Sequence, residues 1–445
     1  MNQSGHFSSD VVVIQPIDKG LIPILNEQDG LYHLQLKGIK NGEAVEETQL
    51  IDNIRLGIDP YLDFKAYLQQ AENPDLQFVI SNTTEAGIAY VDSDLPTDSP
   101  PSSFPAKVAV FLHHRFQFFN GDSKKGLTFF PCELIDKNGE HLHQYIKQLA
   151  EKWGWSTAFI DWLDSANTFY NTLVDRIVPG FPRDNIEEIQ KKLGFSDQLV
   201  VVGEQFHLWV IEGPQEIKLH FPADKTNLNV IFTDDLSPYR TRKVRILNGA
   251  HTLSVPTGYL FGNRTVQENT ENPITGAFLR KAIYEEIIPT LEGEEKELQA
   301  FAEDVIDRFR NPFIKHLLSS IALNSTSKYK TRVLPSLLKY NEITGKVPKR
   351  LALGLAALIC FYKGSFNGEP TPVNDIPAAT DFFNQVWGAW DGSENGTQAL
   401  VKSTLSHADF WNQDLNQISG LGDIVSEQVS IILDGKLSEY MERLG

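Results

Sequence analysis

Three side chains that could act on one substrate atom lie within nine residues, in the stretch KVRILNGAH at 243–251. At about 100° per residue of an α-helix, Asn248 lies about 140° from Lys243 and His251 about 80° from it, so one sector of a helix can present all three. Lys243 could donate a proton to a carbonyl oxygen that Asn248 and His251 orient and polarise, provided that burial or the neighbouring arginines lower its pKa. A basic helix surface with a hydrogen-bonded histidine is the alternative.

Two basic stretches further along the chain could bind an anionic group. They are RFRNPFIKH at 308–316 and SKYKTR at 327–332. On a continuous helix Arg308 and Lys315 would share a face two turns apart, and a planar guanidinium suits a carboxylate. We therefore expect Arg308 and Lys315 to bind a substrate carboxylate, and most of the other cations to lie on a solvated helix surface.

The elements that must hold these residues change in character near residue 237. Ser237 as N-cap and Pro238 at the first helical position predict a helix start, and a mostly helical pattern follows to the end of the chain. Before it, continuous apolar runs alternate with helical patterns, as in a mainly parallel sheet covered on both faces. The runs are VVVI at 11–14, LQFVI at 76–80, LTFFP at 127–131, LWVIE at 208–212 and NVIF at 229–232. Residues 29–51 are predicted to form a hairpin with Asn41 and Gly42 in its turn.

The expected fold class is therefore α/β. It combines a Rossmann-like doubly wound domain at 1–236 with a mainly α-helical domain at 237–445. Lys243, Asn248 and His251 would lie on the opening helices of the second domain.

The amino-acid composition argues against several classes of binding partner and site. The chain of 445 residues has 58 acidic and 40 basic residues, a net charge of −18, which argues against nucleic acid and anionic membranes as partners. Its longest apolar run, at 351–362, is shorter than the roughly 20 residues that a membrane-spanning helix needs. Cys132 and Cys360 stand alone, which predicts neither a disulfide framework nor a metal site and favours the cytoplasm. The oligomeric state is not predicted.

The Lys-(four)-Asn-(two)-His spacing of 243–251 resembles the signature of the polyol-specific long-chain dehydrogenases, the mannitol dehydrogenase family. Further segments resemble one branch of that family and occur in the same order. They are VISNTTEAGI (79–88), FPCELIDKNG (130–139), TLVDRIVPGFPRD (172–184), LNGAHT (247–252), KAIYEEIIP (281–289) and RFRNPFIKH (308–316). The similarity extends from about residue 11 to near the end of the chain.

The resemblance implies reversible hydride transfer between NAD(H) and a sugar carbon, without a metal. Lys243 would be the general acid for keto reduction and the general base for oxidation, with Asn248 and His251 on the reacting oxygen. In this branch the implied reaction is reduction of the keto group of D-tagaturonate to D-altronate, a step in galacturonate breakdown. Reduction of fructuronate is the sister possibility, and a cofactor-free protein that only binds sugar acids is an alternative of another class.

The same resemblance implies further contacts in the first domain. It places Thr84, Glu85 and Glu133 at the cofactor and Asp175 at the substrate. A polar turn after a strand is the alternative for the first two residues, and pairing with Arg176 is the alternative for Asp175. Leu134 stands where mannitol dehydrogenases carry an asparagine. Asn248 would therefore make the contact to the reacting oxygen in its place.

A Gly-rich turn that cradles the cofactor pyrophosphate is expected after the first strand of this family, and the sequence has none. The chain begins just before the strand that the family would number second. Loss of a central strand leaves two strand edges unpaired, at a cost above the usual stability of roughly 5–15 kcal/mol. We expect a further segment before Met1 or, less favoured, a rearranged sheet. Asp18 is the one candidate for selecting NAD over NADP.

Overall fold

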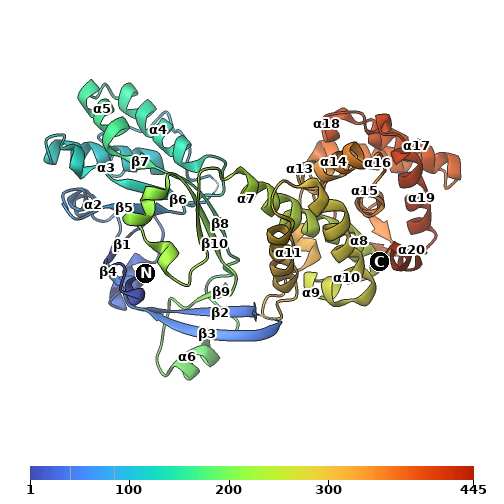
Figure 1. Ribbon diagram of the computed structural model, residues 1–445, viewed down its shortest axis with the longest axis horizontal. Helices are drawn as coiled ribbons and strands as arrows, with labels where there is room; N and C mark the ends of the chain where they lie inside the picture. The colour runs from blue at the N-terminus through green and yellow to red at the C-terminus, as the bar shows by residue number, and fades with distance from the viewer. Residues whose placement is uncertain (41, 85, 445) are drawn as a thin grey trace. The chain divides into compact units, whose positions relative to one another are not determined.

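The chain forms two compact units in its computed structural model (Figure 1), which describes all residues except Asn41, Glu85 and Gly445, and all their side chains except those of Gln3 and Lys40. The first unit contains Met1–Lys37 and Val45–Ser237, and the second contains Gly38–Ala44 and Pro238–Gly445. The chain thus passes from one unit to the other after Ser237, and the tip of the predicted hairpin groups with the second unit.

The first unit is an α/β domain of the Rossmann type. Its strands are β1 (Val11–Ile14), β2 (Tyr32–Lys40), β3 (Glu43–Ile51), β4 (Ile54–Ile58), β5 (Phe78–Ser81), β6 (Thr128–Pro131), β7 (Thr168–Phe169), β8 (Asn171–Asp175), β9 (Val201–Glu204), β10 (Leu208–Glu212) and β11 (Val230–Thr233). Its helices are α1 (Ile22–Glu27), α2 (Phe64–Ala71), α3 (Phe104–Phe118), α4 (Asn138–Lys152), α5 (Thr157–Ala166) and α6 (Ile186–Leu193). Each of the five predicted strands is present, with ends that differ by at most two residues.

Parallel pairing dominates the strands that carry the predicted cofactor residues. β1 pairs with β4, and β6 lies between β5 and β7, all in parallel. The helices α3, α4 and α5 pack beside this second group (Figure 1), where Leu112, Phe129 and Leu142 form part of the apolar core. Because the strands are parallel, the carboxyl ends of β5 and β6 lie at the same edge. The other sheets have the orders β11-β10-β8 and β3-β2-β9.

Two strand edges lack a partner strand within the described residues. β1 pairs only with β4, and β5 pairs only with β6. Ile80 in β5 is 56% exposed, although its apolar run predicts burial on both faces. Val12 and Val79 nevertheless pack against the same apolar cluster, so both strands lie on one core.

The second unit is mainly helical. Its elements are α7 (Ser237–Arg242), η5 (Lys243–Asn248), α8 (Gly249–Phe261), α9 (Val266–Glu271), α10 (Pro273–Lys281), η6 (Ala282–Ile287), α11 (Glu295–Phe309), α12 (Leu318–Ile321), α13 (Ser325–Arg332), α14 (Leu334–Thr344), α15 (Lys349–Phe361), α16 (Pro377–Gly388), α17 (Glu394–Leu405), α18 (Ala408–Trp411), α19 (Leu421–Leu433), α20 (Leu437–Leu444) and the short strands β12 (Ser365–Phe366) and β13 (Glu369–Pro370). Both η5 and η6 are π-helices.

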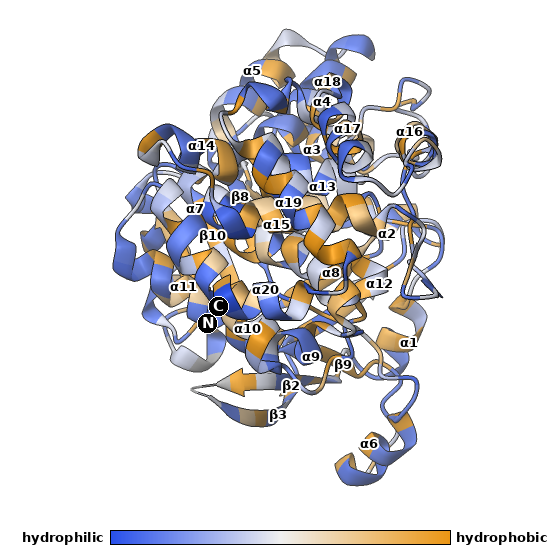
Figure 2. Ribbon diagram, turned by 90° about the vertical axis from the view of Figure 1, so that its right-hand side faces the viewer, coloured by the Kyte–Doolittle hydropathy of each residue, from blue (hydrophilic) through white to orange (hydrophobic). Residues whose placement is uncertain are grey.

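The apolar helix α15 forms the centre of this unit. It packs against α8, α13, α14 and α19, and Figure 2 shows hydrophobic residues concentrated on α8 and α15. Glu286 of η6 accepts hydrogen bonds from the backbone N–H groups of Arg350 and Leu351, which lie in the first turn of α15. None of the helices in the described part of the chain is long and apolar enough to cross a membrane.

Candidate active site

Lys243 and Asn248 are the first and last residues of the π-helix η5. The prediction that this stretch is an α-helix is therefore wrong, although α7 does begin at Ser237, one residue before the predicted start. Hydrogen bonds in a π-helix run from i to i+5, so each turn holds more residues and Asn248 lies closer to the direction of Lys243 than an α-helix would place it. Single π turns occur frequently at functional sites.

Two polar side chains beside Lys243 lack protein partners. Among the described residues, the amide of Asn248 forms no hydrogen bond, and only its backbone carbonyl accepts one, from Thr252 Oγ1 at 2.8 Å. His251 Nε2 is buried and has no hydrogen-bond partner there either. An unsatisfied buried polar group costs about 1–3 kcal/mol, so His251 Nε2 is suited to a ligand oxygen or to water, and the half-buried amide of Asn248 is free to bind the same ligand.

Aromatic contacts fix the ring of His251. It stacks on Phe309 with 4.1 Å between centroids, and the edge of His316 meets it at 5.2 Å and 78°. Burial lowers the pKa of His251 well below its usual value of 6.5, and the charges of neighbouring cations lower it further. The imidazole is therefore neutral at neutral pH.

The cations around His251 come from two helices of the second unit. They are, in order of their effect on its pKa, Arg308, Arg332 and Lys328, whereas the neighbouring His316 has its own pKa lowered by burial and is neutral at neutral pH. Arg308 is buried on α11, and Lys328 of α13 donates from Nζ to the carbonyl of Ile321 at 2.8 Å. Burial and the charge of Arg332 lower the pKa of Lys328. Such a group of cations favours an anionic ligand.

Lys315 does not share a helix face with Arg308, and that prediction is wrong. Helix α11 ends at Phe309, and Pro312 cannot continue it because its ring removes a backbone donor and clashes with the preceding turn. Lys315 is exposed in the loop between α11 and α12.

In the first unit, the end of β6 fixes the loop that follows β5. The buried carboxylate of Glu133 accepts hydrogen bonds from Ser81 Oγ at 3.1 Å, from the backbone N–H of Thr83 at 2.9 Å and from Thr83 Oγ1 at 2.8 Å. Thr84 follows with φ of 75°, and Glu85 lies outside the described residues. Glu133 therefore has a structural role here, and the cofactor contacts of Thr84 and Glu133 stay predictions.

Asn138 is an important residue that the sequence did not reveal. Its fully buried amide donates to the carbonyls of Pro131, Glu133 and Thr172 and accepts from the N–H of Thr172. It thereby joins the end of β6 to β8, whose last residue is Asp175. In the sequence, DKNG has the composition of a turn, and only the fold shows that its asparagine is buried.

Asp175 is buried at the end of β8. Pairing with Arg176 is not its role, because the Arg176 guanidinium donates to the carbonyls of Phe206 at 3.2 Å and Gln205 at 3.5 Å. Leu134, where an asparagine was expected from the family, exposes its side chain. The substrate contact of Asp175 stays a prediction.

The turn between β1 and α1 does not fit a pyrophosphate group. The buried side chain of Gln15 fills it, and a Cβ at Gly20 would lie 2.1 Å from Gln15 Oε1. Gln15 Nε2 donates to the carbonyl of Ile17 and to Asp59, each at 2.9 Å. Asp18 is exposed beside this turn. The polar ends of β5 and β6, in contrast, fit the other half of a dinucleotide, since ligands of such sheets bind at the carboxyl ends of strands.

Comparisons with known proteins cover almost the whole chain. The profile of the Mannitol dehydrogenase Rossmann domain matches residues 1–222, and that of the Mannitol dehydrogenase C-terminal domain matches residues 235–433. An altronate oxidoreductase of Bacteroides thetaiotaomicron is 44% identical over 444 residues, covering 99% of this chain and 92% of the relative. An altronate oxidoreductase of Escherichia coli O1:K1 is 44% identical over 445 residues, covering 100% and 92%.

Solved structures share the fold. A D-sorbitol dehydrogenase in substrate-free form has a TM-score of 0.78 at 21% identity, covering 96% of this chain and 88% of that chain. The Pseudomonas fluorescens mannitol 2-dehydrogenase, solved with NAD and D-mannitol, has a TM-score of 0.66 at 21% identity, covering 98% and 87%.

Proposed function

The chain belongs to the mannitol dehydrogenase family, and we propose that it reduces the keto group of D-tagaturonate to D-altronate, and catalyses the reverse oxidation, with NAD(H) as cofactor. One observation carries the proposal: the side chains of Asn248 and His251, next to Lys243 in the chain, form no hydrogen bond to a described residue, and His251 lies among cations. The names of the two altronate oxidoreductases, each 44% identical to this chain, support the choice of sugar acid.

Lys243 is the residue that transfers the proton in this proposal. When bound, NADH supplies the hydride that reduces the carbonyl carbon. Lys243 Nζ gives a proton to the carbonyl oxygen, while the Asn248 amide donates a hydrogen bond to the same oxygen as negative charge develops on it. Because His251 is neutral, it offers one N–H to that oxygen without adding a charge. In the oxidation, Lys243 takes the hydroxyl proton back.

The substrate carboxylate would bind among the cations near His251. Arg308 is the preferred contact because its guanidinium can bind both carboxylate oxygens. Lys328 and Arg332 add positive charge from α13, against the net charge of −18 of the whole chain. Lys315 and Asp175 are kept as further proposed substrate contacts, and Thr84, Glu85 and Glu133 as proposed contacts of the nicotinamide half of the cofactor.

An absorbance assay tests the reaction. Purified protein with NADH and D-tagaturonate should lose nicotinamide absorbance, and Lys243→Ala should abolish that loss with folding unchanged. D-fructuronate under the same conditions should give a much smaller kcat/KM. Full activity of Lys243→Ala would refute the catalytic assignment, and a preference for D-fructuronate would refute the substrate.

A second pair of variants tests carboxylate binding. Arg308→Met should raise KM for D-tagaturonate at least about tenfold, since it removes a charged hydrogen-bond donor worth roughly 1.5–3 kcal/mol. Lys330→Met is the control, because Lys330 lies on α13 but donates to the carbonyl of Asp409 at 3.3 Å. We also propose the cytoplasm as the location, since Cys132 and Cys360 are both buried free thiols.

A further inference from the structure

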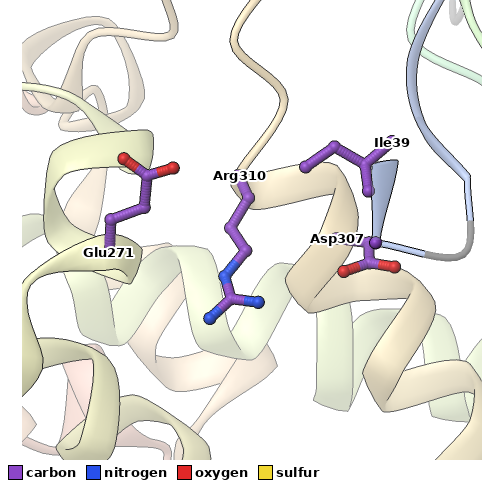
Figure 3. A pocket seen from close by; sticks show the side chains of 5 residues that line it. Ile39, Glu271, Asp307 and Arg310 are labelled. Atoms are coloured by element: carbon purple, nitrogen blue, oxygen red, sulfur yellow. The ribbon is translucent and has the colours of Figure 1, made fainter. Parts of the chain in front are cut away.

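A polar cavity of about 290 Å³ lies in the second unit, and none of the residues assigned above lines it. It is lined by Ile39 and Gly42 of the hairpin tip, Glu271 at the end of α9, and Asp307 and Arg310 at the end of α11. Figure 3 shows the Arg310 guanidinium between the carboxylates of Glu271 and Asp307. The cavity therefore combines one cation with two anions around open space.

The guanidinium of Arg310 faces this cavity without an ion pair to any described residue. Its side chain forms no hydrogen bond or ion pair with any described residue, and its Nε atom is buried without a partner. Arg264 pairs with Glu369 at 2.6 Å and Arg280 with Glu303 at 3.5 Å, whereas Arg242, whose Nε is also buried without a partner, lies over the rings of Tyr239 and Phe301. A buried donor without an acceptor costs about 1–3 kcal/mol, so the buried Nε of the half-buried Arg310 is suited to an acceptor from outside the described protein atoms.

The two carboxylates need donors of their own. Asp307 forms no hydrogen bond within the described structure, and Glu271 accepts only from Gln267 Nε2, at 3.3 Å. Burial raises the pKa of Asp307, although the positive charge of Arg310 opposes this effect. The protein therefore does not fully compensate the negative charge of this carboxylate. With one cation and two anions, the lining has an excess negative charge, which disfavours a simple anion.

We propose that this cavity binds a small α-amino acid as a zwitterion. Its carboxylate would accept hydrogen bonds from Arg310, and its ammonium group would donate to Asp307 and Glu271. The volume of about 290 Å³ lies just below the roughly 300–1,000 Å³ typical of small-molecule sites, which limits the side chain to a small one. The proposal goes beyond the proposed reaction and does not depend on it.

Calorimetric titration of the full chain with L-alanine, without NADH or sugar acid, tests the site. L-Lactate is the matched ligand, because it keeps the carboxylate and replaces the ammonium group by a hydroxyl. We expect saturable binding of L-alanine and at least about tenfold weaker binding of L-lactate, because a charged hydrogen bond is worth roughly 1.5–3 kcal/mol.

Three variants separate the contacts. Arg310→Met should abolish binding of both ligands, Asp307→Asn should weaken L-alanine but not L-lactate, and Arg264→Met, which removes a paired arginine, should change neither. No saturable binding of L-alanine would mean that water alone satisfies Arg310 and would overturn the proposal. Equal affinity for L-lactate, or unchanged binding in a folded Arg310→Met variant, would overturn it as well.

Discussion

The imidazole of His251 stacks on the ring of Phe309, with 4.1 Å between the ring centroids and 18° between the planes. Phe309 is the last residue of α11, whereas His251 lies in the first turn of α8, so the contact depends on the packing of two separate helices. No hydrogen bond to a described residue holds the His251 ring, which leaves aromatic packing to set its direction.

Replacing Phe309 by leucine should reduce catalysis more than stability. The variant keeps an apolar side chain but loses the flat surface under His251. We expect kcat for D-tagaturonate reduction to fall by about ten- to a hundredfold, because small misplacements of a catalytic group have effects of this size. Steady-state kinetics with NADH measure the change.

Phe410 provides the matched control, because it stacks on His407 at 3.9 Å and 10° in another part of the same unit. Phe410→Leu should cost a similar free energy of unfolding, about 1–2 kcal/mol, through lost packing. Its kcat should stay close to that of the wild type. An equal loss of kcat in both variants would show that Phe309 acts only through stability.

His251 should make the protein less stable in mild acid. Its pKa is lowered on folding, first by burial and then by the charges of His316 and Arg308, so the native state favours the neutral ring. The stability that the neutral His251 ring gives is fully present above the unfolded pKa of about 6.5. As pH falls through and below that value, the unfolded chain takes up a proton that the native state does not, so the free energy of unfolding decreases by at most about 1.4 kcal/mol per pH unit. Urea unfolding at pH 7.5, 6.5 and 5.5 measures it.

His251→Phe removes the titrating group and keeps an aromatic ring against Phe309. The difference in unfolding free energy between wild type and this variant should therefore shift in favour of the variant as pH falls below about 6.5. His220→Phe is the control, because His220 is exposed. Parallel pH dependences for wild type and His251→Phe would contradict the prediction.

Lys243, Asn248 and His251 could be proposed from the sequence because they lie in one short segment whose spacing resembles the family signature, and their catalytic roles stay a prediction. The strands were also predictable, since continuous β-branched and aromatic runs such as LWVIE need a sheet buried on both faces. The π-helix at 243–248 was not predictable from the sequence, because the apolar spacing of VRIL suits an α-helix equally well. Asn311 before Pro312 was a signal for the end of α11 that the prediction of a continuous helix to Lys315 overlooked.

The cations around His251 could not be assigned from the sequence, for a different reason. Arg332 and Lys328 lie on α13, about eighty residues after His251, and only the packing of α13 against α8 brings them near its ring. Nothing in the spacing of SKYKTR separates Lys328 from Lys330, which turns toward Asp409. Contacts between distant segments depend on tertiary packing, which local patterns do not encode.

Asn138 should be essential for the stability of the first unit. Asn138→Ala leaves the carbonyls of Pro131, Glu133 and Thr172 without this donor in a fully buried place, and we expect a loss of about 3 kcal/mol or more. Asn341→Ala is the control, because that exposed amide makes one bond, to the carbonyl of Lys346 at 3.2 Å. Urea unfolding followed by tryptophan fluorescence compares them, and equal losses would contradict the role of Asn138.

Gly249→Ala should weaken substrate binding by moving α13. A Cβ at position 249 would lie 3.2 Å from the carbonyl oxygen of Arg332, closer than an ordinary contact, whereas a Cβ at Gly388 would meet nothing within 4 Å. Both changes favour the helix by about 0.5–1 kcal/mol, but only the first displaces Arg332. We expect Gly249→Ala to raise KM for D-tagaturonate about tenfold, since the site needs exact positioning, and Gly388→Ala to leave KM unchanged. Equal KM values in the two variants would show that Arg332 does not contribute to the binding of the carboxylate.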